Sequence, residues 1–233
     1  MSSVLRRAEA QVITMTKVYG YMCLGLIVSA VAAWVFAYVP EFNQFLYTPD
    51  ENGMATLSIA GWIVLLAPLL MLLAAGFIND MDSGATFIFF IVFSLLMGAS
   101  LSSIFMVYTE ASIIQCFAIT SGTFGVMSFY GTVTQKDLSS WGNILIMALI
   151  GIVIAMLVNI FLRSSMLDFV VSIIGILVFT GLTAYDTQKI KEQLNAYNDT
   201  ETCKKIAVWG ALSLYLDFIN LLLMFLRLLG KKK

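Results

Sequence analysis

Two aspartates stand inside long apolar segments of this 233-residue sequence. Asp186 lies near the end of one segment, and Asp217 lies close to the middle of the next. A carboxylate at the centre of a membrane helix costs about 2.5 to 3.5 kcal/mol, so it is seldom kept there without a partner or a water-filled cavity. The two residues are therefore the first candidates for a functional site.

The chain between the two aspartates predicts that they meet. The turn-forming residues 198–202 place the tip of a helical hairpin near residue 200. In an antiparallel pair of helices, Asp186 and Asp217 then differ in height by three residues, or about 4.5 Å. We therefore expect the two carboxyl groups to face each other.

The last apolar segment also carries a narrow stripe of small and polar residues. Its members recur at intervals of three and four and are Gly210, Ser213, Asp217, Asn220 and Met224. Residues at this spacing share one face of a helix. Small and hydrogen-bonding side chains hold membrane helices together, so Ser213 and Asn220 either support the aspartate pair or serve only as packing contacts.

Ionising both carboxyl groups in one low-dielectric site costs much free energy, because two like charges then lie close together. We therefore expect the pair to retain one proton toward neutral pH. When protonated, the two groups can bond to each other; when ionised, they repel each other and attract cations. Oxygen ligands suit Ca²⁺, and only two carboxylates make a weak, transient metal site, which favours passage over storage. A purely structural hydrogen bond and a proton relay without Ca²⁺ are alternatives that use the same residues.

The composition predicts an integral membrane protein. Hydrophobic residues make up 60% of the chain and charged residues 12%, against about 45–50% and about 25% in soluble proteins. The net charge of -1 argues against a nucleic-acid partner. Histidine is absent, and Cys23, Cys116 and Cys203 are far apart in the sequence. The residues that usually form zinc sites, Ser-His-Asp triads and disulfide frameworks are therefore lacking. We expect that the protein is not an enzyme and binds no cofactor, and that Ca²⁺ is only the transported ion.

Seven apolar runs are long enough to cross a bilayer core of about 30 Å. They are residues 18–39, 57–78, 85–108, 113–131, 144–162, 169–190 and 206–229. The sequence thus predicts an all-α membrane bundle of seven transmembrane helices over residues 18–229. A cytoplasmic segment, 1–17, precedes it and a basic tail, 230–233, follows it. The longest connections are expected at 40–56 and 191–205, and the Gly122 and Gly125 pair predicts close helix packing.

The distribution of Lys and Arg favours a cytoplasmic N-terminus. In that orientation the inner side carries eight basic residues: Arg6, Arg7, Lys17, Lys136, Lys189, Lys191, Lys204 and Lys205. The outer side carries five, and four of those lie at the C-terminal end. Seven full spans place Lys231 to Lys233 outside, against the rule, whereas a re-entrant last segment would return them to the cytoplasm. We expect seven spans.

Three stretches of this sequence follow a known pattern. They are GLTAYDTQKI at 181–190, SLYLDFINL at 213–221, and a third stretch that runs from YGTVTQKDLSSWG at 130–142 to VNIF at 158–161. The first two resemble the paired signature of the Bax inhibitor, or transmembrane Bax inhibitor motif, family, and the third resembles its bacterial members. The resemblance implies a last helix at the centre of the other six and a pH-sensitive Ca²⁺ leak. Its aspartate sensor pair corresponds to Asp186 and Asp217.

The resemblance also implies partners and a location. Some members have a basic residue in the second span that latches onto the pair, but residues 57–78 contain no Lys or Arg, so we do not expect that latch. The short N-terminus resembles the bacterial branch and implies the inner, cytoplasmic membrane. A bacterial relative modulates a membrane-bound AAA protease. The alternative function is therefore a membrane-embedded regulator that binds a protease or stress machinery without transporting ions.

Overall fold

The computed structural model describes residues 2–49, 55–76, 81–197 and 199–233. These residues form helices almost throughout, with one short β-hairpin. Their contacts divide the chain into two compact units, one built mainly from Tyr108–Lys232 and the other mainly from Tyr19–Val107. The two units are described separately below.

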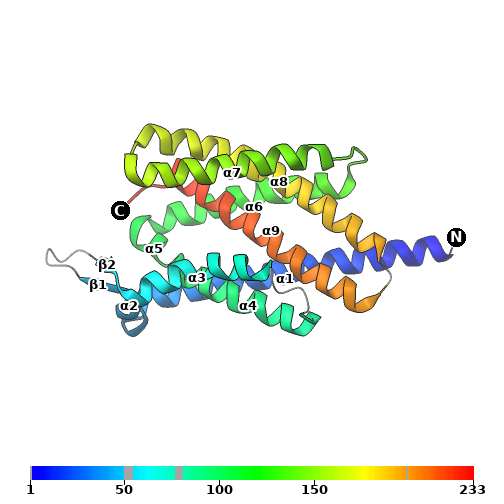
Figure 1. Ribbon diagram of the computed structural model, residues 1–233, viewed down its shortest axis with the longest axis horizontal. Coiled ribbons are helices and arrows are strands. Elements are labelled where there is room, and N and C mark those ends of the chain that lie inside the picture. The colour runs from blue at the N-terminus through cyan, green and yellow to red at the C-terminus, as the bar shows by residue number, and fades with distance from the viewer. Residues whose placement is uncertain (1, 50–54, 77–80, 198) are drawn as a thin grey trace. The chain divides into compact units, whose positions relative to one another are not determined.

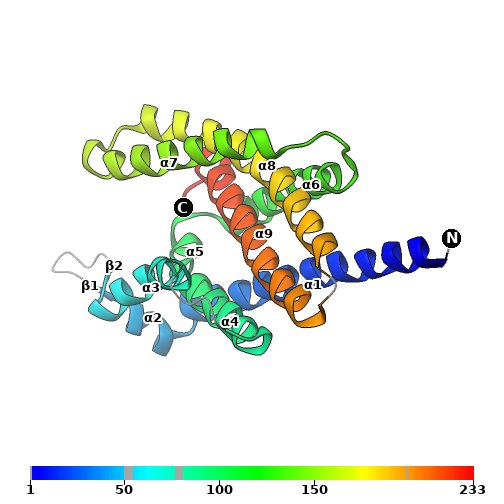
Figure 2. The same ribbon diagram turned by 45° about the vertical axis from the view of Figure 1, so that its right-hand side comes forward.

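The Tyr108–Lys232 unit contains four long helices. They are α6 (Glu110–Val133), α7 (Ser139–Leu162), α8 (Ser165–Ala196) and α9 (Thr200–Leu229). Helices α8 and α9 run antiparallel on either side of a short turn, and this hairpin is the most extensive helix contact in the unit (Figure 1). Helix α6 packs on both of them, and α7 packs on α8 (Figure 2). The α8–α9 hairpin therefore forms the core of this unit.

The stripe predicted on the last apolar segment lies against α8. A side chain at Gly210 would meet Ile190, and one at Gly175 would meet Met224. Between these contacts, Ser213 bonds to Asp186. As the residue numbers of these contacts decrease along α8, they increase along α9. This order is the one expected when two antiparallel helices pack along their length. The predicted stripe is the surface through which α9 contacts α8.

Helices α6 and α8 cross at very close range at Gly131. A Cβ atom at this position would collide with the backbone of Ala184, which cannot move aside as a flexible side chain can. Glycine is required here because the two backbones touch. The prediction of close packing at Gly122 and Gly125 was wrong, since a Cβ atom at either position would meet nothing within 4 Å. Small residues at this spacing occur on the open face of α6 as well as on its packed face.

The α6–α7 connection is tied to α8 by side-chain hydrogen bonds. Gln188 accepts from the Leu138 N–H at 2.8 Å and donates to the Lys136 carbonyl at 2.9 Å. Lys191 Nζ donates to the Thr132 carbonyl at 2.7 Å. A connection without secondary structure of its own thereby gains partners for its backbone groups.

The Tyr19–Val107 unit has more irregular parts. It contains most of α1 (Ser2–Tyr38), then α2 (Pro40–Leu46), β1 (Tyr47–Pro49), β2 (Ala55–Leu57), α3 (Ile59–Ala75), α4 (Ser83–Ser100) and α5 (Ser103–Val107). The strands pair antiparallel, with Thr48 opposite Thr56. Helix α3 packs on α4. Ser29 Oγ of α1 donates to the Ser94 carbonyl of α4 at 2.7 Å, so a buried hydrogen bond joins these helices.

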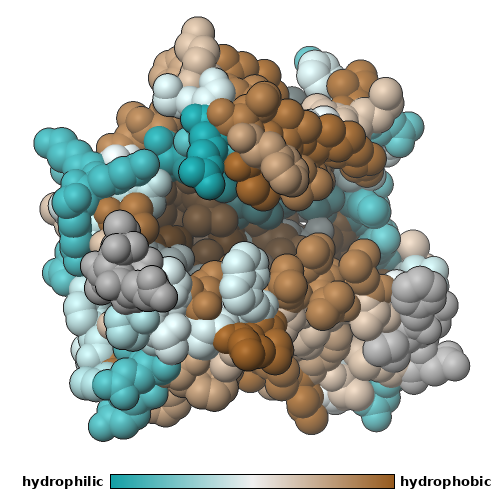
Figure 3. Space-filling model, turned by 60° about the vertical axis from the view of Figure 1, so that its left-hand side comes forward, coloured by the Kyte–Doolittle hydropathy of each residue, from teal (hydrophilic) through white to brown (hydrophobic). Residues whose placement is uncertain are grey.

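The predicted all-α membrane bundle is confirmed in outline. Six helical segments are long and apolar enough to cross a bilayer: Met15–Tyr38, Ser83–Val107, Glu110–Val133, Ser139–Leu162, Ser165–Ala196 and Thr200–Leu229. The seventh, α3, has 17 residues, about 26 Å at 1.5 Å per residue, which is the lower limit for a span. On the face drawn in Figure 3, hydrophobic side chains cover much of the surface, as lipid contact requires.

Several boundaries differ from the prediction. Helix α1 begins at Ser2, so residues 2–17 of the expected N-terminal segment are part of the first helix. Residues 40–56 were expected to be a plain connection, but they contain α2 and a β-hairpin; its tip, with Asp50 and Glu51, lies outside the described residues. The run 85–108 was expected to be one helix, but it breaks after Ser100 because Ser100 and Ser102 donate to the Met97 and Ala99 carbonyls. The connection 191–205 is mostly helical, since α8 continues to Ala196.

The C-terminal end shows that the last helix does not turn back. Helix α9 is continuous from Thr200 to Leu229. The tail then pairs with the start of α6: the Thr109 N–H donates to the Lys231 carbonyl and the Lys231 N–H donates to Ser112 Oγ, both at 3.0 Å. The tail therefore lies at the end of the unit where α6 begins, and α9 shows no break that would return it toward the α8–α9 turn.

Candidate functional site

The structure brings Asp186 of α8 and Asp217 of α9 together. Their carboxyl groups lie close enough to interact directly. Asp186 Oδ2 accepts a hydrogen bond from Ser213 Oγ at 2.7 Å. Asp217 is only 5% exposed, and its Oδ2 atom has no hydrogen-bond partner among the described residues. The site is thus a pair of carboxyl groups, one bonded and one partly unsatisfied.

Register explains why Ser213 and Asp217 both reach Asp186. Ser213 lies at the height of Asp186, and Asp217 lies one helical turn further along the same face of α9. The predicted offset between the aspartates was three residues, and the four residues from Ser213 to Asp217 make it about one residue larger. Asp186 is therefore held between a hydroxyl at its own height and a second carboxyl group one turn away.

Buried aromatic side chains lie close to Asp217 in the sequence of α9. Phe218, the neighbour of Asp217, meets Phe117 and Phe124 of α6 edge-on at ring-centroid distances of 5.4 and 5.6 Å. Tyr215 is fully buried two residues before Asp217. Asp217 itself is buried, so the local dielectric constant is low and charge interactions between the carboxyl groups are strong.

The α8 side of the site is more polar than the sequence indicated. Thr187, next to Asp186, is fully buried, and its Oγ1 lies 3.0 Å from Ser128 Oγ of α6. Lys189 is exposed but lies within electrostatic reach of Asp186. Neither Ser128 nor Thr187 was predicted to be part of the site. The buried threonines Thr183 and Thr187 flank Asp186 at helical spacing, which was a usable signal, but nothing in the sequence pairs Thr187 with Ser128.

The predicted supporting face is divided between two roles. Ser213 bonds to the aspartate pair, as described above. Asn220 instead donates from Nδ2 to the Leu216 carbonyl of its own helix at 2.8 Å. A side-chain bond to the carbonyl four residues earlier is a local contact within a helix. Its amide donors are thus directed along α9.

The ligand set is small for a resident metal. Ca²⁺ in stable protein sites takes six to eight oxygen ligands. Among the described residues there is no cluster of three or more His, Cys, Asp or Glu side chains that could hold a metal ion. Two carboxyl groups and the Ser213 hydroxyl supply hard oxygen ligands in a number suited to brief contact with a cation.

Comparison with known proteins identifies the family. The sequence profile described as "Inhibitor of apoptosis-promoting Bax1" matches residues 11–233. The inner membrane protein YbhL of Escherichia coli K12 is 46% identical over 94% of this chain and 92% of its own length. A Borreliella burgdorferi protein is 45% identical over 94% of this chain and 92% of its own length. Protein RP147 of Rickettsia prowazekii is 42% identical over 94% of this chain and 89% of its own length.

The matches extend over nearly the whole chain and include both helices that carry the aspartate pair. They agree with the resemblance of the stretches around Asp186 and Asp217. The chain belongs to the Bax inhibitor-1 family.

Proposed function

We propose that this protein is a pH-sensitive leak channel for Ca²⁺ or a similar cation, with Asp186 and Asp217 as proton sensor and ion contact. The observation that carries the proposal is the close approach of two buried carboxyl groups, of which Asp217 has an Oδ2 atom without a geometric hydrogen-bond partner among the described residues. A buried polar atom without a partner costs about 1 to 3 kcal/mol. A fold that keeps such an atom has a use for it other than stability.

The gating mechanism follows from the two charge states. When one carboxyl group is protonated, the pair can share the proton, and α8 and α9 stay closely packed around it. When both groups are ionised in the same low-dielectric site, they repel each other and together attract a cation. We therefore expect ion flux to rise as the pH increases from 6 to 8.

The arrangement in the membrane is part of the proposal. We infer seven spans, with α3 as the shortest and α9 at the centre of the other six, and a cytoplasmic N-terminus. Because the relative YbhL is described as an inner membrane protein, we assign this chain to the inner membrane as well. The basic tail then lies outside the cytoplasm. In a chain whose native cysteines, Cys23, Cys116 and Cys203, are replaced by serine, a thiol reagent should label Lys233→Cys from that side only.

Calcium flux into proteoliposomes tests the proposal. The wild-type protein should admit Ca²⁺ with a rate that increases between pH 6 and pH 8. Asp217→Asn and Asp186→Asn should each remove most of that pH response. Asp199→Asn is a matched control, since Asp199 is an exposed helix cap and asparagine caps equally well.

Two results would overturn the proposal. One is the absence of flux at any pH from a protein that is folded and correctly inserted. The other is an unchanged pH response in the Asp217→Asn variant. Either result would favour the alternative function, a membrane-embedded regulator that acts by binding a protease or stress machinery.

A further inference from the structure

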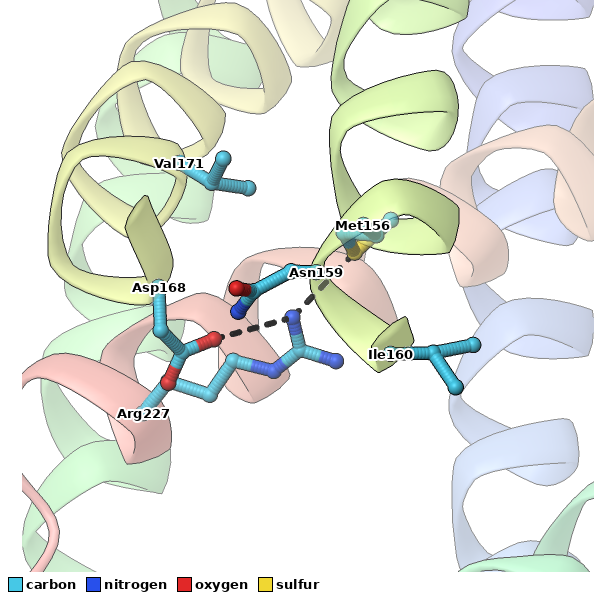
Figure 4. A pocket seen from close by; sticks show the side chains of 6 residues that line it. All are labelled: Met156, Asn159, Ile160, Asp168, Val171 and Arg227. Atoms are coloured by element: carbon cyan, nitrogen blue, oxygen red, sulfur yellow. Dashed lines mark hydrogen bonds and ion pairs between the residues drawn. The ribbon is translucent and has the colours of Figure 1, made fainter. Parts of the chain in front are cut away.

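A second polar site lies at the opposite end of α8 from its hairpin turn. A cavity of about 240 Å³ opens where α7 ends, α8 begins and α9 ends (Figure 4). Its lining residues are Met156, Asn159, Ile160, Asp168, Val171 and Arg227. One water molecule takes up about 30 Å³, so the cavity has room for a larger group. Asp168 and Asp186 are 18 residues apart on α8, about 27 Å, so this site is distinct from the aspartate pair.

Arg227 is poorly satisfied by the protein itself. Its Nη1 atom lies 3.8 Å from Asp168 Oδ1, which is too long for a strong hydrogen bond. Arg227 Nη1 also contacts Met156 Sδ at 3.2 Å, and a thioether is a weak acceptor. Tyr108 lies within electrostatic reach of the same guanidinium. A guanidinium has five N–H donors. Most of them therefore remain available to a ligand in the cavity.

The side chain of Asn159 is held in a fixed orientation. Its Oδ1 atom accepts from the Ser164 N–H at 2.9 Å, across the tight turn in which Arg163 has a φ of 51°. The Nδ2 group is then the part of the amide that can serve a ligand. Figure 4 shows the Asn159 amide turned toward the space beside Asp168 and Arg227. The cavity thus presents donors from two helix ends at one place.

The charges in the cavity match a zwitterion. Arg227 and Asn159 supply donors for an anionic group such as a phosphate, and phosphate is a good partner for guanidinium. Asp168, whose side chain is 48% exposed, supplies a carboxylate for a cationic group such as an ammonium. A purely anionic ligand would meet the repulsion of Asp168. A ligand with both charges would pair each of them.

The surroundings of the cavity match a lipid. The cavity lies at the ends of three apolar helices, where headgroups begin. Beside it, Ile160, Phe161 and Phe169 are 65%, 87% and 51% exposed. Apolar side chains this exposed on a membrane helix contact acyl chains. We infer that the cavity binds the headgroup of a zwitterionic phospholipid of the phosphatidylethanolamine type, with its phosphate on Arg227 and its ammonium on Asp168.

Native mass spectrometry of the full chain in detergent tests this inference. Wild-type protein should retain phosphatidylethanolamine in preference to phosphatidylglycerol, which has the phosphate but not the ammonium. Arg227→Gln should weaken binding of phosphatidylethanolamine about tenfold, as the loss of a charge-assisted hydrogen bond predicts. Asp168→Asn should remove the preference between the two lipids. Lys204→Gln, which removes an exposed cation from the other end of α9, should change neither result.

The outcomes are distinguishable. Equal retention of the two lipids by wild-type protein, or unchanged retention by a folded Arg227→Gln variant, would overturn the inference. In a further experiment, free phosphoethanolamine is added as a competitor of the bound lipid. If it displaces the lipid at equal concentration, the ligand is a soluble phosphate compound and the assignment to lipid is wrong. Thermal melting of each variant verifies that the fold is retained.

Discussion

Helices α7 and α9 are both membrane helices, yet they use their side chains in opposite ways. Helix α7 is the most hydrophobic of the long helices, and only 6% of its most apolar stretch is buried in the protein. The corresponding stretch of α9 is less hydrophobic, and 56% of it is buried. In water the more hydrophobic helix would be the buried one. Here lipid surrounds α7, and the polar groups of α9 are enclosed by protein.

The contrast shows where sequence changes should matter. Lipid tails are as apolar as leucine, so a helix gains little by burying apolar side chains against another helix. Close backbone approach and hydrogen bonds must hold α8, α9 and α6 together instead. Substitutions that disturb those contacts should therefore have large effects, and the same substitutions on α7 should have small ones.

The largest effect is expected from leucine at the glycine where α6 crosses α8. Gly131→Leu would force a side chain into the Ala184 backbone and should lower stability by about 3 kcal/mol or more. Gly151→Leu on α7, where an added Cβ meets nothing within 4 Å, should change it by less than about 0.5 kcal/mol. Thermal unfolding followed by tryptophan fluorescence in detergent measures both. Similar losses for the two variants would contradict the contrast between the helices.

The next effect concerns the hydrogen bonds from α8 to the α6–α7 connection. Gln188→Ala leaves the Leu138 N–H and the Lys136 carbonyl without these partners and should cost about 2 kcal/mol. Met147→Ala on α7, where the side chain is 72% exposed, is the control and should have little effect. Hydrogen exchange at the Leu138 amide should accelerate in the first variant alone. Unchanged protection there would mean that Gln188 does not hold the connection.

A smaller effect, this time an increase in stability, is expected from a substitution inside α9. Asp217→Asn removes the repulsion that arises when both buried carboxyl groups are ionised, and at pH 8 it should raise stability by about 1 kcal/mol while it impairs function. Asp168→Asn, at the exposed end of α8, separates a weak ion pair and should lower stability by less than about 1 kcal/mol. Chemical or thermal unfolding at pH 8 gives the two signs. A destabilised Asp217→Asn variant would show that the carboxyl group is a structural element.

The smallest effect is a local dependence on pH at the start of α9. Hydrogen bonds from Thr202 lower the pKa of Asp199 below its ordinary value. A group with a lowered pKa stabilises the folded state above its unfolded pKa, near about 4. That contribution disappears as the pH falls through the lower, folded pKa.

The Thr202 amide reports this loss. After correction for the intrinsic exchange rate, its protection should decrease between pH 5 and pH 3 in the wild type. Asp199→Asn keeps the cap but cannot titrate, so its protection should not change with pH. The same decrease in both proteins would assign the effect to another group.

Hydropathy located the long helices of this chain but not their ends. It marks the interval of a helix that lies in lipid, whereas capping determines where the helix stops. The run expected to begin at residue 206 starts at Thr200, because Asp199 accepts hydrogen bonds from Thr202 there. The break after Ser100 depends on which hydroxyls bond to nearby carbonyls, and hydropathy carries no information on that.

The candidate site was predictable only as far as the α8–α9 hairpin extends. A short turn and helical spacing are local properties, so they sufficed to place Asp186 near Asp217 and Ser213 on the same face. Ser128 meets Thr187, and Gln188 reaches the α6–α7 connection, only because α6 crosses α8 at Gly131. Gly122, Gly125 and Gly131 all lie on α6, but only Gly131 contacts another backbone. One sequence does not show which of these glycines lies at the crossing.

The pairing of the C-terminal tail has a consequence for how the protein is made. The partners of Lys231 lie at the start of α6, and the bond to Ser112 spans 119 residues of sequence. As the chain is synthesised, α6 must wait for three more membrane helices before its first turn acquires this partner. This end of the Tyr108–Lys232 unit therefore forms only after the α8–α9 hairpin has been synthesised.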